Sequence, residues 1–270
     1  MIDARFFQTL PPGSGVITTE ENPCSLLQFS LVRLEPGQSS QGHTKGNEAV
    51  LVVLGGKIRL ETEKEDFGVI GERANVFQGS PWSVYLPPGT GYAMTAAEGF
   101  PSIAVVEAPA QTGDAPFLIP PNEVETGVWG KKNFTRYYRK ILVNTNRKVE
   151  RLIVGETITP SGNWSSYPPH RHEVDRLPHE VFAEEIYYFK VSPSEGFGLT
   201  YHYTDDRKID RAYPVTDDSI LYIPKGYHTV ASAPGYTTYY LWALAGNHRT
   251  QAVSDDPAVG WVKKAEALLD

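Results

Sequence analysis

The sequence is poor in cysteine, in long apolar runs and in positive charge. Cys24 is the one cysteine among 270 residues, so no disulfide can form within the chain. The N-terminal segment MIDARFFQTLPPGSG lacks the basic flank and apolar stretch of a secretory signal. No run approaches the roughly 18 apolar residues that a membrane-spanning helix needs. We therefore expect a soluble, cytoplasmic protein with no membrane partner.

The charge balance argues against a nucleic-acid partner. Lys and Arg number 25 against 32 Asp and Glu, which gives a net charge of -7, whereas proteins that bind the phosphate backbone present a basic surface. The sequence also lacks a DNA-binding helix pattern and a Gly-rich dinucleotide fingerprint, which removes the obvious redox cofactor. We expect a small-molecule partner instead, and a chain that forms a homo-oligomer.

Turn residues and short apolar segments dominate what is present. The chain has 24 glycines and 21 prolines, and they separate segments such as AVLVVL, SVYLP, RLIVGETIT, EIYYFKV and SILYIP. Many short strands divided by turns indicate a sandwich or a closed barrel. Helical periodicity occurs only near the end, in DDPAVGWVKKAEALLD. The sequence predicts an all-β fold with a short C-terminal helix.

Two landmarks recur at one offset along the chain. Glu48 leads into the strand-like AVLVVLG, and Glu185 leads into IYYFKV, 137 residues later. The Pro-x-Gly turns that begin at Pro87 and Pro224 are displaced by the same 137 residues. Self-similarity at a fixed offset indicates a duplicated structural unit. We predict two homologous barrels.

The join between the barrels is expected in the Pro-rich stretch APAQTGDAPFLIPPNE. We place the boundary near residue 112, with one barrel in residues 1–112 and the other in residues 113–270. The apolar residues 117–119 within this stretch need cover from water. The stretch is therefore predicted to be a packed connector and not a free linker.

The second half contains a candidate metal site. His170 and His172 stand two apart in a segment expected to be extended, so both side chains share one face. Glu185 heads the next strand, and His228 follows the Pro-x-Gly turn in IPKGYHTV. A lone His-x-His pair is more often an ordinary core or surface pair. Combined with the acid, the turn and the repeat, it favours one divalent ion: Zn, Mn, Fe, Co or Ni.

Neighbouring residues compete for these roles. Strand alternation puts Glu184 and Glu185 on opposite faces, so only one of them points inward. The spacing of 39 residues from acid to turn proline, shared with Glu48 and Pro87, selects Glu185. His179 lies in a polar insertion that is more typical of a solvated loop or a lid, and Arg171 is expected to point away from the site.

The first half resembles the same site with parts removed. Gln41-x-His43-x4-Glu48 has the form His-x-His-x4-Glu with its first histidine replaced, and Tyr92 stands where the late histidine is expected. Loss of two imidazoles should remove most of the metal affinity. We predict that the N-terminal barrel is structural or interfacial, with a degenerate site in which His43 and Glu48 are remnants.

These motifs carry a resemblance to known proteins. Both halves resemble the cupin superfamily, which pairs a His-x-His...Glu motif with a later Pro-x-Gly...His motif. The stretches GNWSSYPPHRHE, EEIYYFKV, YHYTDDR and IPKGYHTVASAPGY resemble the 5-deoxy-glucuronate isomerase family of bacterial myo-inositol catabolism, over nearly the whole C-terminal half and more loosely in the first. This implies two tandem cupin-type jelly-roll barrels, with His170, His172, Glu185 and His228 as the metal ligands. The long insertion before Glu185 and a shortened turn depart from the broad cupin pattern.

The family also implies a reaction. It interconverts 5-deoxy-D-glucuronate and 5-dehydro-2-deoxy-D-gluconate, a carbonyl shift from C1 to C2 of a sugar acid through an enediolate, whose two oxygens a metal with adjacent open positions can hold.

For the remaining chemistry we name three candidates: Tyr187, which shares a face with Glu185, and Lys225 and Arg207 as partners of the substrate carboxylate. Core packing or a surface charge explains each of them equally well. Two alternative functions remain open: a metal-dependent dioxygenase and a non-catalytic sugar-acid-binding protein.

Overall fold

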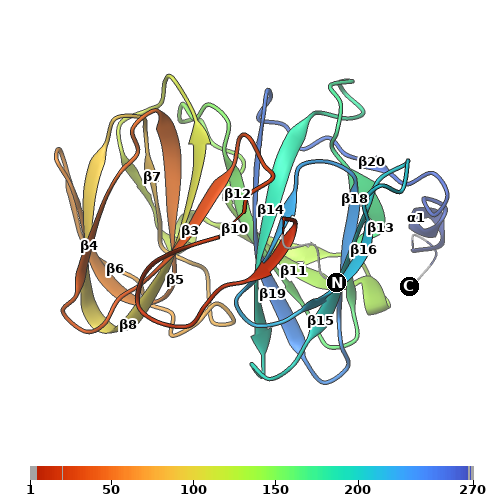
Figure 1. Cartoon of the computed structure of the whole chain (residues 1–270), viewed down its shortest axis with the longest axis horizontal. Helices are drawn as coiled ribbons and strands as arrows, with labels where there is room; N and C mark the ends of the chain where they lie inside the picture. Colours follow the sequence, from red (N-terminus) through yellow and green to blue (C-terminus); the bar gives the residue numbers. More distant parts are fainter. Residues whose placement is uncertain (1–4, 20, 267, 269–270) are drawn as a thin grey trace.

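The computed structural model describes residues 5–19, 21–266 and 268, and these residues are built almost entirely from strands and turns. Figure 1 shows the strands in two groups that lie side by side, one for each half of the chain. The regular α-helix of the described residues is α1 (Val262–Glu266), and two short 3-10 turns, η1 (Pro121–Glu123) and η2 (Lys132–Phe134), connect strands. The predicted all-β fold with a short C-terminal helix is confirmed. Residues 267 and 269–270 of the expected helix lie outside the described residues.

The N-terminal half forms one strongly bent sheet. The strand order is β2-β3-β8-β5-β7-β9, with β4 paired to β8 and β6 paired to β5. The bounds are β2 (Gly15–Thr18), β3 (Gln28–Arg33), β4 (Ser39–His43), β5 (Asn47–Thr62), β6 (Asp66–Ile70), β7 (Ser83–Leu86), β8 (Gly91–Pro109) and β9 (Phe117–Ile119).

Two long strands close this half into a barrel. β5 and β8 pair along most of their length, and the register shifts on both sides of Gly55. Gly56 has a φ of +79°, and a Cβ there would lie 2.8 Å from the Cα of Pro101. Glycine is required at this bend because a side chain would meet both the backbone strain and the neighbouring strand.

The C-terminal half is a sandwich of two sheets. One sheet has the order β1-β17-β14-β19-β12-β11-β10 and the other β16-β15-β18-β13-β20. The bounds are β1 (Phe7–Thr9), β10 (Glu125–Trp129), β11 (Arg136–Leu142), β12 (Ile153–Thr159), β13 (Trp164–Arg171), β14 (Ala183–Ser192), β15 (Gly198–Tyr203), β16 (Asp210–Val215), β17 (Ser219–Ile223), β18 (Tyr227–Ser232), β19 (Thr237–Gly246) and β20 (Ser254–Asp255).

Two strands cross the boundary expected near residue 112. β1, from the start of the chain, pairs with β17 of the C-terminal half. β9, beyond the expected boundary, pairs with β7 of the N-terminal half and buries Phe117 and Ile119. The stretch around β9 is therefore a packed segment, as predicted. The division into 1–112 and 113–270 remains a proposal that these two strands modify.

The largest apolar cluster lies where the halves meet. It contains buried side chains from both halves, and Phe29 of β3 stacks on Tyr188 of β14 with 5.2 Å between ring centroids. Strand alternation explains the sorting, because Ile186 and Tyr188 belong to this cluster while Tyr187 and Phe189 belong to the interior of the C-terminal half.

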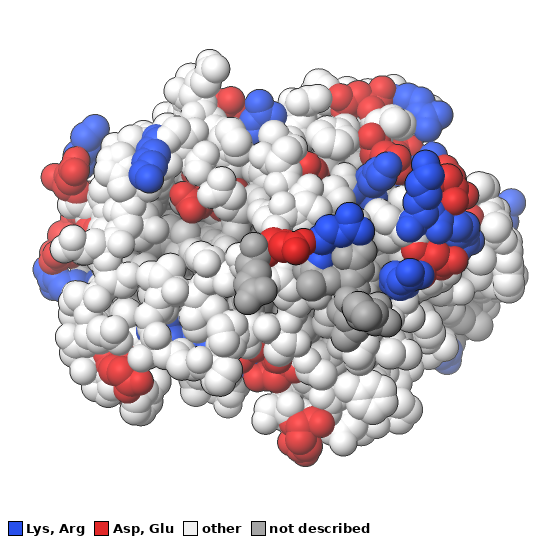
Figure 2. All heavy atoms as spheres, viewed as in Figure 1, with Lys and Arg blue, Asp and Glu red and all other residues white. Residues whose placement is uncertain are grey.

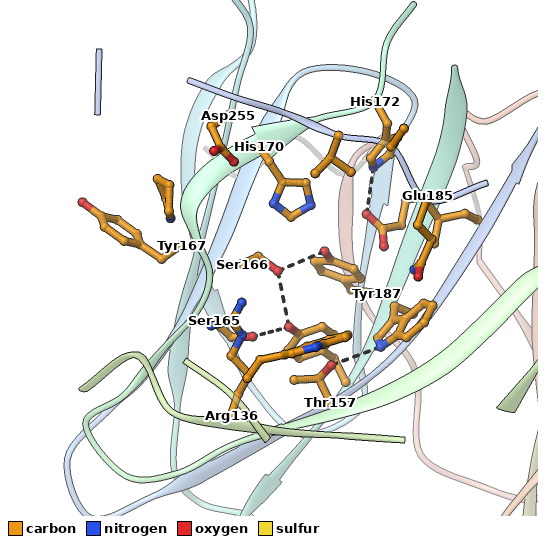
Figure 3. A pocket seen from close by; sticks show the side chains of 18 of the residues that line it. Arg136, Thr157, Ser165, Ser166, Tyr167, His170, His172, Glu185, Tyr187 and Asp255 are labelled. Atoms are coloured by element: carbon orange, nitrogen blue, oxygen red, sulfur yellow. Dashed lines mark hydrogen bonds and ion pairs between the residues drawn. The ribbon is translucent and has the colours of Figure 1, made fainter. Parts of the chain in front are cut away.

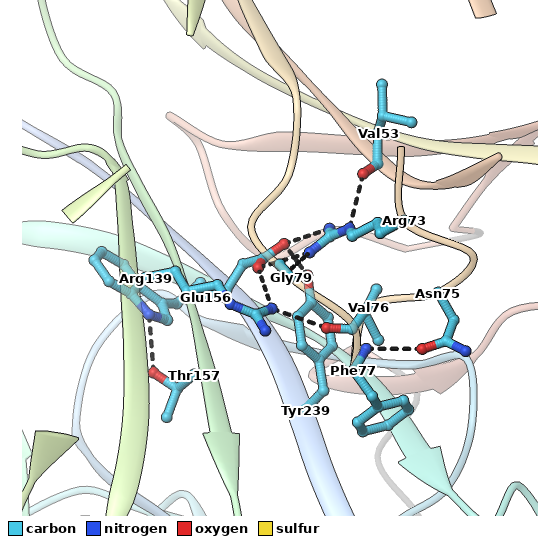
Figure 4. A network of polar contacts seen from close by, with 11 residues as sticks. Val53, Arg73, Asn75, Val76, Phe77, Gly79, Arg139, Glu156, Thr157 and Tyr239 are labelled. Atoms are coloured by element: carbon cyan, nitrogen blue, oxygen red, sulfur yellow. Dashed lines mark hydrogen bonds and ion pairs between the residues drawn. The ribbon is translucent and has the colours of Figure 1, made fainter. Parts of the chain in front are cut away.

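A buried ion pair also joins the halves (Figure 4). Arg73 donates to both carboxylate oxygens of Glu156 at 2.6 and 3.0 Å, and Arg139 and Tyr239 donate to the same carboxylate. Burial raises the pKa of Glu156, but the charge and hydrogen bonds of Arg73 outweigh it and hold that pKa below its usual value. The carboxylate therefore stays ionised within the interface.

Charges of both signs are mixed on the visible surface. Figure 2 shows Lys and Arg interspersed with Asp and Glu, with the densest mixed group over the C-terminal half. None of the helices formed by the described part of the chain is long and apolar enough to cross a bilayer.

Candidate metal centre

Four side chains from three strand regions meet between the two sheets of the C-terminal half. His170 lies on β13 and His172 follows the end of that strand, while His228 lies on β18, where it pairs with His170. Glu185 projects from β14 in the facing sheet. One ligand atom from each of the four residues lies within 4.8 Å of all the others. Within the residues that the structure describes, this is the one such group of three or more His, Cys, Asp or Glu side chains.

The backbone fixes the tautomers of two of the imidazoles. Nδ1 of His172 lies 2.6 Å from the carbonyl oxygen of Ala183, and Nδ1 of His228 lies 3.2 Å from that of Gly226. A carbonyl oxygen only accepts, so each Nδ1 donates a proton. Nε2 of both rings then faces one carboxylate oxygen of Glu185, at 3.0 Å in each case. The donor set converges on a single point.

The charges of the site follow from burial and from these contacts. Burial raises the pKa of Glu185, but the hydrogen bonds from His172 and His228 outweigh it and lower that pKa to about 2. Burial, and then the charge of His228, hold the pKa of His170 well below its usual value. For His172 the hydrogen bond and charge of Glu185 outweigh burial, so its pKa is raised. The cluster therefore combines an ionised carboxylate with a neutral His170.

A cavity of about 420 Å³ opens from this cluster. His170, His172 and Glu185 line it, whereas His228 is fully buried. In Figure 3, these three residues occupy one end of the cavity and Arg136 and Thr157 lie at the other. The wall between them carries hydroxyl groups, which are those of Ser165, Ser166, Tyr187 and Tyr240. A cavity of this size with convergent polar groups suits a small polar molecule.

Tyr187 lies in the cavity wall next to the cluster. Its ring packs edge-on against His228 with 5.6 Å between centroids, and its hydroxyl is 3.4 Å from Oγ of Ser166. Burial, followed by the charge of Glu185, raises the pKa of Tyr187 well above its usual value. The phenol therefore stays protonated and can donate a hydrogen bond to a bound ligand.

The structure contradicts the expected positions of the two cations. Arg207 is exposed, donates to the hydroxyl of Tyr201 at 2.8 Å and does not line the cavity. Lys225 is exposed in the turn before β18 and is likewise absent from the cavity wall. Both follow or precede strands whose inward residues are close to the site, and the turns direct their own side chains outward.

The competing residues lie away from the cluster. Arg171 points to the opposite side of β13, where it pairs with Asp205 and stacks 4.9 Å from the ring centre of Tyr227. His179 is exposed in the loop before β14. Both positions agree with the expectations from the sequence.

The predicted remnant at Glu48 is wrong. Ala49 pairs with Leu86, the residue before the first turn proline, as Glu185 pairs with Ile223 before the second. Ala49 therefore occupies the position of Glu185, and Glu48 occupies that of Glu184. The shared 39-residue spacing selected the inward acid through an alignment that is one residue out of register.

Glu48 and Glu184 have an equivalent role in joining the halves. The Glu48 carboxylate accepts the backbone N–H groups of residues 150–152 at 2.7 to 2.9 Å and the hydroxyl of Tyr85. Glu184 accepts the N–H groups of Ser25 and Leu26 and the hydroxyl of Ser25. Each acid thus holds a segment of the opposite half.

The rest of the expected degenerate site is filled or exposed. His43 is exposed and pairs with Gly91, where the C-terminal half pairs His170 with His228. The interior of this half is packed with apolar side chains such as Leu51 and Met94. The N-terminal half has no comparable cluster among its described residues.

The sequence pattern missed three charged residues of the cavity. Arg136 begins β11, Asp255 ends β20 and Lys263 lies on α1, and all three line the cavity. No motif marks them, because their strands and helix come to the site only when the two sheets pack. The segment NFTRYYRK gives no signal that separates Arg136 from Arg139, which points to the opposite face.

Comparisons with known proteins agree with this architecture. Residues 13–262 match the KduI/IolB family. A protein of Geobacillus kaustophilus named 5-deoxy-glucuronate isomerase is 41% identical over 254 residues, covering 93% of this chain and 90% of its own. The crystal structure of an IolB-like protein from Salmonella typhimurium LT2 superposes with a TM-score of 0.90 and 31% identity, over 96% of this chain and 99% of its own.

A more distant likeness identifies the fold. Bacillus subtilis oxalate decarboxylase, a protein with Mn(II) centres, superposes with a TM-score of 0.63 at 14% identity, over 94% of this chain and 80% of its own. At this identity the likeness concerns the fold alone. The predicted pair of cupin-type barrels is confirmed.

Proposed function

This chain belongs to the KduI/IolB family, and from that membership we propose that it is a 5-deoxy-glucuronate isomerase of myo-inositol catabolism. The reaction converts 5-deoxy-D-glucuronate to 5-dehydro-2-deoxy-D-gluconate by moving the carbonyl from C1 to C2. The observation that carries the proposal is the cluster of three imidazoles and one carboxylate at one end of a polar cavity. The relative of the same name supports the substrate.

We propose that His170, His172, Glu185 and His228 hold one divalent metal ion, which is Mn, Zn, Fe, Co or Ni. The donor set fits, because Nε2 of His172 and of His228 face the Glu185 carboxylate while their Nδ1 protons are held by carbonyls. When bound, the ion would supply a Lewis acid for the two oxygens of the reacting carbons. It would also take the place of the proton on His172, since metal binding to imidazole releases protons.

The remaining residues provide hydrogen bonds and proton transfer. Tyr187, which is protonated, donates to an oxygen of the substrate, and Ser166 orients its hydroxyl. Outside the cluster, Asp255 is the one carboxylate among the described residues of the cavity wall. We assign it the transfer of a proton from C2 to C1, with Lys263 at 2.6 Å holding the carboxylate in place.

The test is direct conversion of the sugar acid. Purified protein is incubated with 5-deoxy-D-glucuronate under nitrogen and without nicotinamide, and the ketose is followed by nuclear magnetic resonance. We expect turnover that stops after chelation and returns when metal is added. Oxygen uptake coupled to substrate loss would favour a dioxygenase, and saturable binding without conversion would favour a sugar-acid-binding protein. Either result would refute the proposal.

A further inference from the structure

Arg136 has a guanidinium group that the fold holds but does not neutralise. It is half-buried at the start of β11 and lines the cavity. Its Nη1 donates to the carbonyl oxygen of Phe134 at 3.1 Å, and its guanidinium carbon lies 5.7 Å from the ring centre of Trp129. Among the described residues, no carboxylate forms an ion pair with it. Arginine has five N–H donors, so most of them remain available to a ligand.

The other cation of the cavity is already paired. Lys263 contacts Asp255 at 2.6 Å, and its side chain is 55% exposed. Arg139, on the same strand as Arg136, is committed to Glu156 in the interface between the halves. Arg136 is therefore the cation of the described cavity wall that can bind an anion without first losing a carboxylate partner.

The surroundings of Arg136 leave space for its guanidinium. Gly130 has a φ of +73°, and a Cβ there would lie 2.8 Å from Nη1 of Arg136 and 2.1 Å from the carbonyl oxygen of Phe134. A larger residue would displace both the arginine and the carbonyl that orients it. The stacked Trp129 covers the group on one face. The arginine is thus held in a built pocket at the end of the cavity.

The position of Arg136 matches the shape of a sugar acid. Figure 3 shows Arg136 at the end of the cavity opposite His170, His172 and Glu185, with hydroxyl groups between them. In 5-deoxy-glucuronate the reacting carbonyl and the carboxylate are at opposite ends of the carbon chain. When the reacting carbons lie against the metal-ligand cluster, the carboxylate lies toward the far end.

We propose that Arg136 binds the carboxylate of the substrate and sets the preference for sugar acids over neutral aldoses. This inference rests on the proposed isomerase function and names the specificity residue of the same site. A guanidinium binds a carboxylate through two parallel hydrogen bonds, a geometry that a lysine ammonium does not reproduce. A site built for such a contact discriminates strongly against a ligand that lacks the charged group.

Kinetics on a matched pair of substrates tests the proposal. The pair is 5-deoxy-D-glucuronate and the analogue in which a hydroxymethyl group replaces its carboxylate. We expect Arg136→Met to raise KM for the acid by roughly 30-fold or more, with kcat/KM for the neutral analogue unchanged within a few-fold. Arg136→Lys should recover only part of the loss. Arg207→Met removes a guanidinium outside the cavity and should leave both substrates unaffected.

Two kinetic outcomes would overturn the assignment. An equal loss on both substrates would mean that Arg136 only supports the fold around Trp129. A selective loss in Lys263→Met, with Arg136→Met unaffected, would move the carboxylate site to α1.

Binding separates this inference from the proposed reaction. Calorimetric titration with D-gluconate and with the neutral polyol D-glucitol needs no turnover. We expect wild type to bind gluconate more tightly than glucitol, and Arg136→Met to lose that difference. A wild type that converts neither substrate but shows this pattern would refute the isomerase function and retain the carboxylate site. Equal gluconate affinity in wild type and Arg136→Met would refute the role of Arg136.

Discussion

Exchanging single acids for their amides separates metal binding from the joining of the two halves. Glu185 lies in the His cluster, whereas Glu184 and Glu48 hold segments across the interface. We expect Glu185→Gln to lose bound metal, and both Glu184→Gln and Glu48→Gln to retain it. The last two variants should instead lower the free energy of unfolding.

The magnitude follows from the hydrogen bonds that an amide cannot accept. At Glu184, one carboxylate oxygen accepts the N–H and hydroxyl of Ser25, and the other accepts the N–H of Leu26 at 2.6 Å. A glutamine has one acceptor oxygen, and its NH2 group would face a donor on the other side. Losing one buried charge-assisted bond costs about 2 kcal/mol.

Glu48 should be the more sensitive position. Each of its oxygens accepts two hydrogen bonds, from Arg151 and Leu152 on one side and from Glu150 and Tyr85 on the other. An amide there leaves two donors unpaired, so we expect a loss of about 3 kcal/mol or more.

Metal content and stability are measured separately. Metal is counted by mass spectrometry after dialysis, and urea unfolding is followed in chelator, because bound metal itself stabilises the folded state. Glu195→Gln, at an exposed acid, is the matched control. Loss of metal in Glu184→Gln with retention in Glu185→Gln would refute the strand register. An unchanged stability of Glu48→Gln would refute its role at the interface.

Four further predictions concern the site and the interface. Wild type should carry one metal ion per chain and the double variant His170→Ala, His172→Ala close to none, as counted by mass spectrometry; a stoichiometry near two would contradict the single site. Arg73→Met should lower the unfolding free energy by about 3–5 kcal/mol because it leaves the Glu156 carboxylate buried beside too little positive charge, and an unchanged urea midpoint would disprove this. Asp255→Asn should reduce kcat by roughly 100-fold or more with KM nearly unchanged, whereas full kcat would exclude it as the proton carrier. Turnover in deuterated water should place label at the terminal hydroxymethyl carbon of the ketose; complete retention of the substrate hydrogen would point to a shielded transfer or a hydride shift.

Local patterns in the sequence determined the fold class and which residues of β14 face inward. Alternation along a strand has a period of two, so Glu185, Tyr187 and Phe189 had to share a face once that segment was a strand. The His-x-His pair and the histidine after the Pro-x-Gly turn predicted the four residues that the structure brings within 4.8 Å of one another. These features depend on neighbours in the sequence, which is why they could be predicted.

The tertiary structure decided what depends on register and on packing between distant segments. A spacing of 39 residues could not show that Glu48 faces the other half, because one residue of slip in a strand reverses every side chain. The exchange of β1 and β9 between the halves has no local signal, since edge pairing depends on which strand end is free. Arg136 and Asp255 became cavity residues only when the two sheets packed face to face. The sequence by itself determined the ligand set and the strands that carry it, and the packing of those strands determined which charged side chains the cavity presents to a substrate.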